Sequence, residues 1–380
     1  MCRHMCGKAN VPIDACHSVS DLRDLARRRL PRPLFDFLDG GAEGEATLQR
    51  NGAAFDEQRI LPRCLVDVSS VKTSTRILGQ RIEWPLFCSA TGASRLFHPD
   101  GELAVARAAA KCGTLYSLAT GSTYDIESIS AASAGPKVFQ IYVYKDRAVT
   151  WELIERARAA GYGALCVTVD APSIGKRERD LRSGFPSPIK KIRSAISYAA
   201  HPRWLLGQAR VGPIKLANFS AHRRGHWEID SSLTWPDLEA IAARWSGPIA
   251  LKGLMRADDA RRACEVGATA IVVSNHGGRQ LDGAASPLDV LSEVVEAVQG
   301  SAEIILDSGI RRGSHILKAL ALGANACSIG RPYLYGLAAA GEVGVTKALD
   351  ILRTEFVLAM QLAGCRDLVA ISPDLLRSHR

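Results

Sequence analysis

The residues best suited to chemistry stand in one short stretch, residues 270–283, which reads AIVVSNHGGRQLDG. Its apolar opening is typical of a strand buried on both faces. His276 and Arg279 follow on a turn loosened by two glycines. An imidazole can take up a proton near neutral pH, and a guanidinium offers a planar fork that matches a carboxylate. The pair indicates a site for abstracting a proton from a small acid; the alternative is a His and an Arg on an ordinary surface loop.

Apolar segments that read as strands recur eight times along the chain. They are Leu86–Ser89, Leu115–Ala119, Val138–Tyr142, Ala164–Val169, Ile249–Lys252, Ala270–Ser274, Ile304–Asp307 and Ala326–Gly330. The helices expected between them are Glu102–Cys112, Ile126–Ala132, Thr150–Ala160, Ala257–Val266, Pro287–Val298 and Gly313–Leu322. Alternating strands and helices predict parallel pairing with right-handed crossovers. We expect an α/β protein with a (β/α)₈ TIM barrel; a doubly wound open sheet is the alternative, but no early GxGxxG turn supports it.

Residues 18–55 are predicted to be a helical extension ahead of the barrel. A long basic insertion, 174–230, interrupts the barrel after the fourth strand. We therefore expect a single barrel domain over 18–375, with residues 1–17 as a mobile N-terminus.

Composition excludes several classes of protein. The chain is 47% apolar and 23% charged, as folded proteins are. It has no apolar run long enough to span a bilayer, and its first residues lack the apolar core of a secretory signal. Ten scattered cysteines read as reduced residues of a cytoplasmic protein. Cys2, His4, Cys6, Cys16 and His17 match no strong zinc pattern, so no metal site is predicted.

Polar residues stand at the C-terminal end of every predicted strand, where barrels carry their active sites. They are Thr91, Ser117, Gln140 with Tyr142, Thr168 with Asp170, Lys252, His276 with Arg279, Asp307 with Arg311, and Gly330 with Arg331. The last two strands lead into glycine-rich turns beside arginines, which is how phosphate sites are built. A phosphate site opposite a base and an anion clamp predicts a phosphorylated cofactor across the barrel mouth.

The motifs SNHGGRQLDG, IALKG, LDSGIRRG, SIGRP and QIYVYKDR resemble those of the FMN-dependent α-hydroxy acid oxidases and dehydrogenases. The resemblance runs from about Leu22 to Pro373. The pieces IGKRERDLRSGF, HPRW and LANF are most similar to the membrane-associated mandelate and lactate dehydrogenases. The resemblance implies FMN as cofactor and oxidation of an L-2-hydroxy acid to the 2-oxo acid.

The same resemblance implies catalytic roles. His276 would remove the C2 proton, or accept the hydroxyl proton while hydride passes to the flavin, and both options stay open. Asp170 would orient the imidazole and stabilise its protonated form. Arg279 would bind the substrate carboxylate, with Arg177 as a second cation, and Tyr142 would hydrogen-bond the substrate.

Lys252 would lie beside flavin N1 and O2 and stabilise the anionic reduced ring. The cofactor-binding positions implied by the resemblance are Ala90, Thr91, Gly92, Ser117, Gln140, Thr168, Lys252, Ser274, Asp307, Gly309, Arg311, Gly330 and Arg331. The substrate-binding positions are Phe37, Leu118, Tyr142, Arg177, His276 and Arg279.

Several positions depart from the family pattern. Phe37 stands where most members have a tyrosine that binds the substrate carboxylate. Tyr116 stands where a flavin-binding serine is usual, and Ser117 could substitute. Leu118 stands where glycolate oxidase has a bulky aromatic residue, and we expect this change to leave room for a larger substrate side chain. Gly92, where oxidases tend to have alanine, favours a dehydrogenase that reacts slowly with oxygen.

Positive charge is concentrated in residues 174–226, which hold twelve Lys or Arg and two Asp or Glu. The net charge of the whole chain is +9. Apolar residues interleave with these cations, as on an amphipathic surface that binds anionic lipid. In the similar membrane-associated enzymes this insertion contacts the membrane and the acceptor is a quinone. The alternative is a solvated lid over the site. Nucleic-acid binding has no supporting motif, and the resemblance implies a homotetramer.

The sequence thus predicts an FMN-dependent 2-hydroxy acid dehydrogenase, peripheral on the inner face of the membrane. The alternatives are an oxidase that uses O₂, an FMN enzyme of this fold acting on a modified peptide or an amine, and a barrel that binds flavin or lipid without catalysis.

Overall fold

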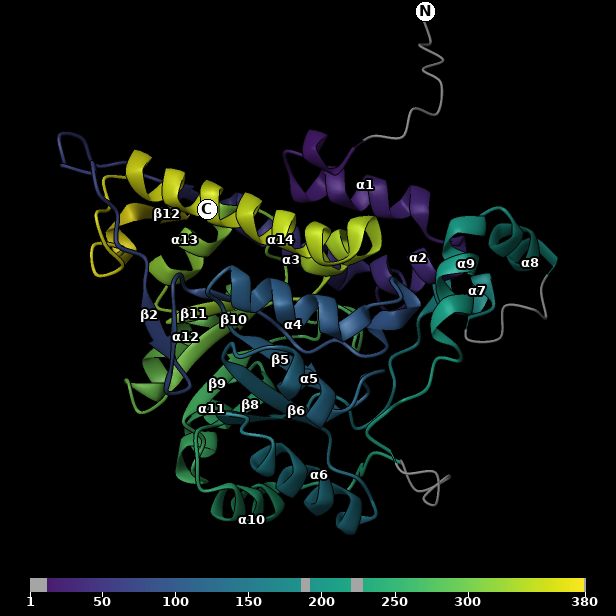
Figure 1. The fold of residues 1–380 in the computed structure, drawn as a ribbon. Coiled ribbons are helices and arrows are strands. Elements are labelled where there is room, and N and C mark those ends of the chain that lie inside the picture. Colours follow the sequence, from purple (N-terminus) through teal and green to yellow (C-terminus); the bar gives the residue numbers. More distant parts are fainter. Residues whose placement is uncertain (1–11, 186–191, 220–227, 379–380) are drawn as a thin grey trace, which may run out of the picture.

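A closed barrel of eight parallel strands forms the centre of the computed structural model, which describes residues 12–185, 192–219 and 228–378 (Figure 1). The strands are β4 (Leu86–Cys88), β5 (Tyr116–Ala119), β6 (Lys137–Ile141), β7 (Ala164–Thr168), β8 (Ile249–Leu254), β9 (Ala270–Val273), β10 (Glu303–Asp307) and β11 (Ala326–Ile329). They follow one another around the barrel in chain order, and β11 pairs with β4 to close it. The predicted TIM barrel is confirmed. Cys2, His4 and Cys6 lie outside the described residues.

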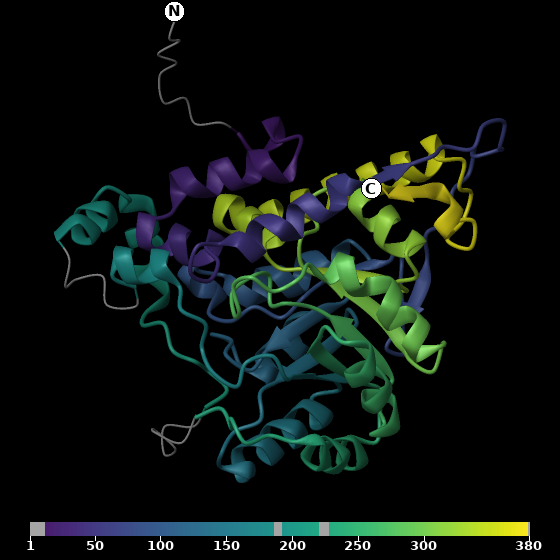
Figure 2. The same cartoon turned by 180° about the vertical axis from the view of Figure 1, so that it is seen from behind.

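Helices surround the barrel on its outer side (Figure 2). They are α4 (Gly101–Lys111), α5 (Ile126–Ala132), α6 (Arg147–Ala159), α10 (Trp235–Trp245), α11 (Ala257–Glu265), α12 (Pro287–Val298), α13 (Gly313–Ala321) and α14 (Arg331–Leu362). Helix α10 was not predicted, although a capping box of Thr234 and Asp237 marks its start. Helix α14, which is kinked at Ala340 and Gly341, was not predicted either.

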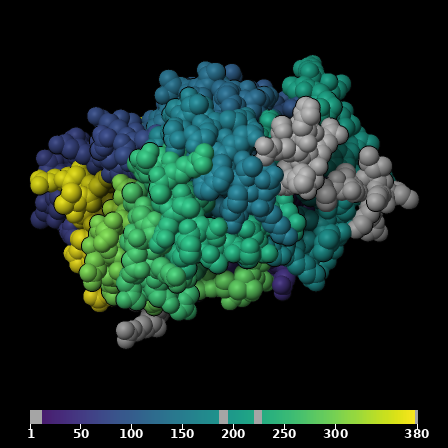
Figure 3. All heavy atoms as spheres, turned by 90° about the horizontal axis from the view of Figure 1, so that it is seen from below, coloured from purple at the N-terminus to yellow at the C-terminus, as the bar shows by residue number. Residues whose placement is uncertain are grey.

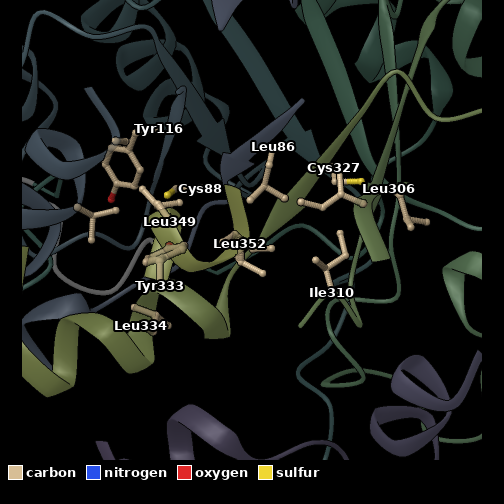
Figure 4. Packing of buried hydrophobic residues seen from close by; sticks show 14 of the residues in the cluster. Leu86, Cys88, Tyr116, Leu306, Ile310, Cys327, Tyr333, Leu334, Leu349 and Leu352 are labelled. Carbon is tan, nitrogen blue, oxygen red and sulfur yellow. The ribbon is translucent and has the colours of Figure 1, made fainter. Parts of the chain in front are cut away.

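Alternation along each strand divides its side chains between two apolar layers. Leu115, just before β5, and Ser117 in it face the barrel interior, whereas Tyr116 and Leu118 face the surrounding helices. In the outer layer, Tyr333 and Leu349 of α14 pack beside Cys88 and Tyr116 (Figure 4). Because both faces of the strands are buried, they read as continuous apolar runs, which is why they were predictable.

The N-terminal extension packs against the outer helices, with α1 on α14 and α3 on α12. It contains η1 (Ile13–Ala15), α1 (Val19–Arg29), α2 (Arg32–Asp39) and α3 (Ala46–Glu57). The small pairs β1 (Gln58–Ile60) with β12 (Leu376–Ser378) and β2 (Thr75–Ile77) with β3 (Gln80–Ile82) are antiparallel. Two further short helices are η2 (Ser94–Leu96) and η5 (Pro373–Leu375). Among these residues, no helix is long and apolar enough to cross a membrane.

The insertion between β7 and α10 contributes α7 (Glu178–Ser183), α8 (Ile192–Ala199) and α9 (Pro202–Val211). These helices project at one edge of the molecule (Figures 1 and 3). The indole N–H of Trp204 donates to the Leu96 carbonyl at 2.9 Å, and the Gln208 amide donates to the Arg95 carbonyl at 2.6 Å. The segment is therefore fastened to the loop that follows β4.

Candidate active site

A cavity of about 300 Å³ opens at the C-terminal ends of the strands. The residues that both line it and were singled out from the sequence are Phe37, Ala90, Thr91, Gly92, Gln140, Tyr142, Arg177, Lys252, His276, Arg279, Asp307, Gly309, Arg311, Gly330 and Arg331. Three other predicted residues do not line the cavity but form hydrogen bonds with residues that do. Asp170 and Ser274 hydrogen-bond His276, and Thr168 accepts a hydrogen bond from Gln140 at 2.9 Å.

His276 and Asp170 form a hydrogen-bonded pair at the cavity wall. The Nδ1 of His276 lies 2.9 Å from the Asp170 carboxylate. Because a carboxylate can only accept, Nδ1 carries the proton and Nε2 is left as the basic nitrogen. Burial lowers the pKa of His276, and Asp170 opposes that shift by stabilising the imidazolium. The imidazole is therefore neutral and able to accept a proton at neutral pH.

Arg279 lies beside this pair with most of its guanidinium available. Its Nη1 donates to the carbonyls of Phe37 and Gly40 at 2.7 and 2.9 Å. Its guanidinium carbon lies 5.0 Å from the centre of the Phe37 ring, in cation–π contact. Burial lowers the pKa of Arg279, and the nearby cations Arg177 and Arg331 lower it further. An anion placed among these guanidinium groups would relieve their repulsion.

Lys252 lies in a buried polar cluster that adjoins His276 through Ser274. Its ammonium lies 3.6 Å from the Asp307 carboxylate and 3.2 Å from the Ser274 hydroxyl. Asp307 also accepts hydrogen bonds from Ser274 at 2.6 Å and Ser328 at 2.7 Å. Burial opposes the charge on Lys252, but Asp307 and Asp170 outweigh it and raise the Lys252 pKa. The ammonium is thus a fixed positive charge at the barrel mouth.

The turns after β10 and β11 bring Gly309, Arg311 and Gly330 to the cavity. Arg331 donates to the carbonyls of Gly277 and Gly40 at 2.9 and 2.8 Å. Its buried Nε has no hydrogen-bond partner among the described residues, and burial lowers its pKa to about 10. An orphaned cationic donor beside glycine turns fits a phosphate group, so this end of the cavity suits the phosphate of FMN and the Lys252 end suits its ring.

The expectation for Leu118 was wrong. Leu118 is fully buried in the outer apolar layer, because the alternation of β5 turns it away from the cavity. Tyr116 faces the same way, and Ser117 faces the barrel interior, lining a small cavity that adjoins the main one. The residues of this segment that reach the main cavity are Ala119 and Gly121.

Aromatic residues that the sequence analysis did not single out complete the cavity region. Phe37 stacks on Phe185 with ring centres 4.3 Å apart and faces Phe97 at 6.2 Å. Phe97 and Leu334 line the cavity with Phe37. Phe185 lies in the basic insertion just after α7 and Phe97 lies before α4, so neither carried a local signal that could have found it.

A barrel whose mouth gathers a histidine–aspartate pair, several guanidinium groups and glycine turns fits an oxidoreductase with a phosphorylated flavin. The family model of FMN-dependent dehydrogenases matches residues 26–378, and the chain belongs to that family. FMN is its cofactor and 2-hydroxy acids are the substrates of the class.

Two curated relatives and one solved structure illustrate the similarity. The L-lactate oxidase of Nostoc sp. is 45% identical over 94% of this chain and 97% of its own. Glycolate oxidase 3 of Arabidopsis thaliana is 40% identical over 93% of this chain and 94% of its own. The crystal structure of the monotopic membrane protein (S)-mandelate dehydrogenase superposes with a TM-score of 0.92 at 38% identity, over 96% of this chain and 100% of that one.

Proposed function

We propose that this enzyme oxidises an L-2-hydroxy acid with a large apolar side chain to the 2-oxo acid and passes the electrons to a quinone. The observation that carries the proposal is that the His276–Asp170 pair and Arg279 meet at a cavity that is also lined by Phe37 and Phe97. FMN supplies the two-electron acceptor for this oxidation.

The protein residues bind the acid and move its proton. Arg279, supported by Arg177, holds the substrate carboxylate. Burial raises the pKa of Tyr142, so its phenol stays protonated and donates a hydrogen bond to the substrate. His276 accepts the proton through Nε2, and Asp170 stabilises the imidazolium that results.

The cavity wall supports a substrate larger than lactate. Phe37, Phe97 and Leu334 offer apolar surface, and Phe37 lacks a hydroxyl that would bind a carboxylate. A Cβ built on Gly121 meets no atom within 4 Å, so the cavity has free space there. An aryl or branched side chain would fill that space and bury apolar area.

The test is an anaerobic visible spectrum of the FMN-loaded protein with (S)-mandelate, L-lactate or glycolate. We expect mandelate to bleach the flavin at the lowest concentration and glycolate to need the highest. Bleaching by none of the three would overturn the 2-hydroxy acid assignment in favour of another substrate. Equal efficiency of all three would overturn the preference for a large side chain.

Readmission of air to the reduced protein separates the two acceptor classes. Slow return of the yellow colour, accelerated by an added quinone, is the result expected for a dehydrogenase. A Cβ added at Gly92 would come within 3.0 Å of the Gly121 carbonyl, so this loop is packed for glycine. Reoxidation by air that is faster than by quinone would favour the oxidase alternative.

An exposed apolar surface on the insertion supports contact with a membrane, where a quinone would be found. Its members are Ile196, Leu205, Leu206, Val211 and Leu216, between 36% and 63% exposed. Exposed Arg203, Arg210 and Lys215 accompany them. Trp204, by contrast, is tied to the barrel by its indole hydrogen bond. Apolar side chains beside cations suit an anionic lipid surface.

Replacing Leu205 and Leu206 with Asp is expected to lower binding to anionic phospholipid vesicles by at least about tenfold, because two apolar anchors become charged. Turnover with a soluble dye should stay unchanged. The measurement is co-sedimentation with the vesicles. The matched control is the same pair of changes at Leu358 and Leu362 of α14, which are 51% and 69% exposed.

Equal loss in the control pair, or no loss in the Leu205 and Leu206 variant, would rule out this surface as the lipid contact. Point substitutions are preferable to excising the insertion, because Asn218 within it donates to Thr120 and Ser122 and accepts from the Ile126 N–H. The homotetramer implied by the resemblance stays a prediction.

A further inference from the structure

Helix α3 lies along the loop that carries His276, although more than 200 residues separate them in the chain. The Asp282 carboxylate accepts hydrogen bonds from the backbone N–H groups of Thr47 at 2.8 Å and Ala46 at 3.2 Å. It thereby satisfies donors at the start of α3 that have no partner within the helix. Gly278 lies so near this helix that an added Cβ would come within 2.7 Å of the Leu48 nitrogen. The loop therefore follows the surface of α3.

Two buried side-chain amides, Asn51 on α3 and Asn275 in the loop, connect the helix to the residue that precedes His276. They exchange two hydrogen bonds, at 2.9 and 2.7 Å, and are 1% and 8% exposed. The Asn275 oxygen also accepts from the Gly278 N–H at 3.1 Å, and its nitrogen donates to the Ala285 carbonyl at 3.0 Å. Each atom of the Asn275 amide thus has a partner that fixes its orientation.

Three consecutive backbone N–H groups around His276 are held by side chains. The His276 N–H donates to the Ser274 hydroxyl and the Gly277 N–H to the Ser308 hydroxyl, and the Gly278 N–H donates to both the side-chain and the backbone oxygen of Asn275. His276 itself has a φ of +58°, in the left-handed region that disfavours a residue with a Cβ. Such a conformation persists only when its surroundings hold it.

The two serines extend from the ends of neighbouring barrel strands, so the barrel positions them. Asn275 is instead held from outside the barrel, by Asn51. The backbone of Asn51 also touches the next loop, because a Cβ added at Gly309 would come within 2.1 Å of the Asn51 carbonyl oxygen. Asn51 is thus a point where α3, the His276 loop and the loop after β10 meet.

We propose that Asn51 is a positioning residue for the reaction and that α3 is the template on which the His276 loop takes its reactive shape. Asn51 orients the Asn275 amide, which holds the turn after His276 and so directs the imidazole toward Asp170 and the cavity. The inference rests on the proposed role of His276 as the base.

The test compares Asn51→Ala with Asn325→Ala in the FMN-loaded protein. Asn325 accepts a hydrogen bond from the Ile304 N–H at 2.7 Å, at the opposite end of the barrel. In Asn51→Ala we expect the rate constant of flavin reduction to fall by about 10- to 100-fold, since misplacement of a catalytic group by about 1 Å has effects of that size. FMN content and the Kd of the 2-oxo acid product should stay within about twofold of the wild type, and Asn325→Ala should keep its rate.

Two further measurements separate positioning from general destabilisation. The acid limb of the pH–rate profile should move to lower pH in Asn51→Ala, because a weaker contact with Asp170 removes an interaction that raises the His276 pKa. Hydrogen exchange of residues 274–283 should quicken in Asn51→Ala and not in Asn325→Ala.

An unchanged rate and acid limb in Asn51→Ala would overturn the proposal, as would an equal loss in Asn325→Ala. The exchange measurement needs no substrate. If no 2-hydroxy acid reduced even the wild-type flavin, the proposed function would fail, and unchanged exchange in Asn51→Ala would independently overturn the role of α3.

Discussion

Replacing His276 with Ala is expected to leave FMN bound while the rate of flavin reduction by the 2-hydroxy acid falls by roughly a thousandfold or more. General base catalysis contributes about 10²- to 10⁴-fold, and here the neighbouring clamp and cofactor site would remain. No other neutral imidazole lines the cavity among the described residues. Stopped-flow reduction of the loaded variant under anaerobic conditions measures the effect.

The backbone conformation of His276 calls for a second variant. Because its φ is +58°, Ala could shift the loop for reasons unrelated to the lost base. Asn tolerates this region better than Ala does, so His276→Asn should show the same loss with an undisturbed loop. His201→Ala, a change on the insertion away from the cavity, is the control and should keep its rate. A base role for His276 is wrong if either His276 variant is reduced at the wild-type rate.

The barrel was predictable because its strands can be recognised from the local sequence. They are short, mostly apolar runs buried on both faces, and most have a polar residue at or near the C-terminal end. Leu251 and Lys252 on β8, or Val273 and Ser274 at the end of β9, show the change from core to site within two residues. Local sequence therefore specified both the fold and the residues at the strand ends.

The face of a strand on which each side chain lies was harder to predict from the sequence. Leu118, which we expected to contact the substrate, lies on the outer face of β5, whereas its neighbour Ala119 lines the cavity, because adjacent side chains in a strand face opposite ways. Gly121, after the strand, also lines the cavity, and a Cβ added there would meet no atom within 4 Å. No local pattern reveals such open space beside a loop glycine.

Contacts between distant segments were the least predictable. Asn51 is a polar residue within a helix, a position usually on a solvated face, yet it is buried against Asn275. Likewise, Phe185 joins the aromatic wall only because the insertion folds back over α2, where Phe37 lies. No spacing rule relates such residues, since tertiary packing alone brings them together.

Replacing Arg279 with Met is expected to lower kcat/KM for the 2-hydroxy acid by about 30- to 3000-fold. Losing one partner of a buried, hydrogen-bonded charge pair costs about 2–5 kcal/mol, and each 1.4 kcal/mol is a factor of ten. Met retains a similar length and apolar stem, so the stacking surface beside Phe37 is largely kept. Arg279→Lys retains the charge without the planar fork and should fall between Met and the wild type.

Discrimination between the acid and its methyl ester identifies the interaction that is lost. The wild type should prefer the acid strongly, because the guanidinium binds a carboxylate with two parallel hydrogen bonds. Arg279→Met should lose most of that preference, whereas Arg256→Met, at a surface arginine paired with Asp258, should keep it. If Arg279→Met still preferred the acid by the wild-type factor, the carboxylate would be bound not by Arg279 but by Arg177. That residue lines the same cavity, and its buried Nε has no hydrogen-bond partner among the described residues.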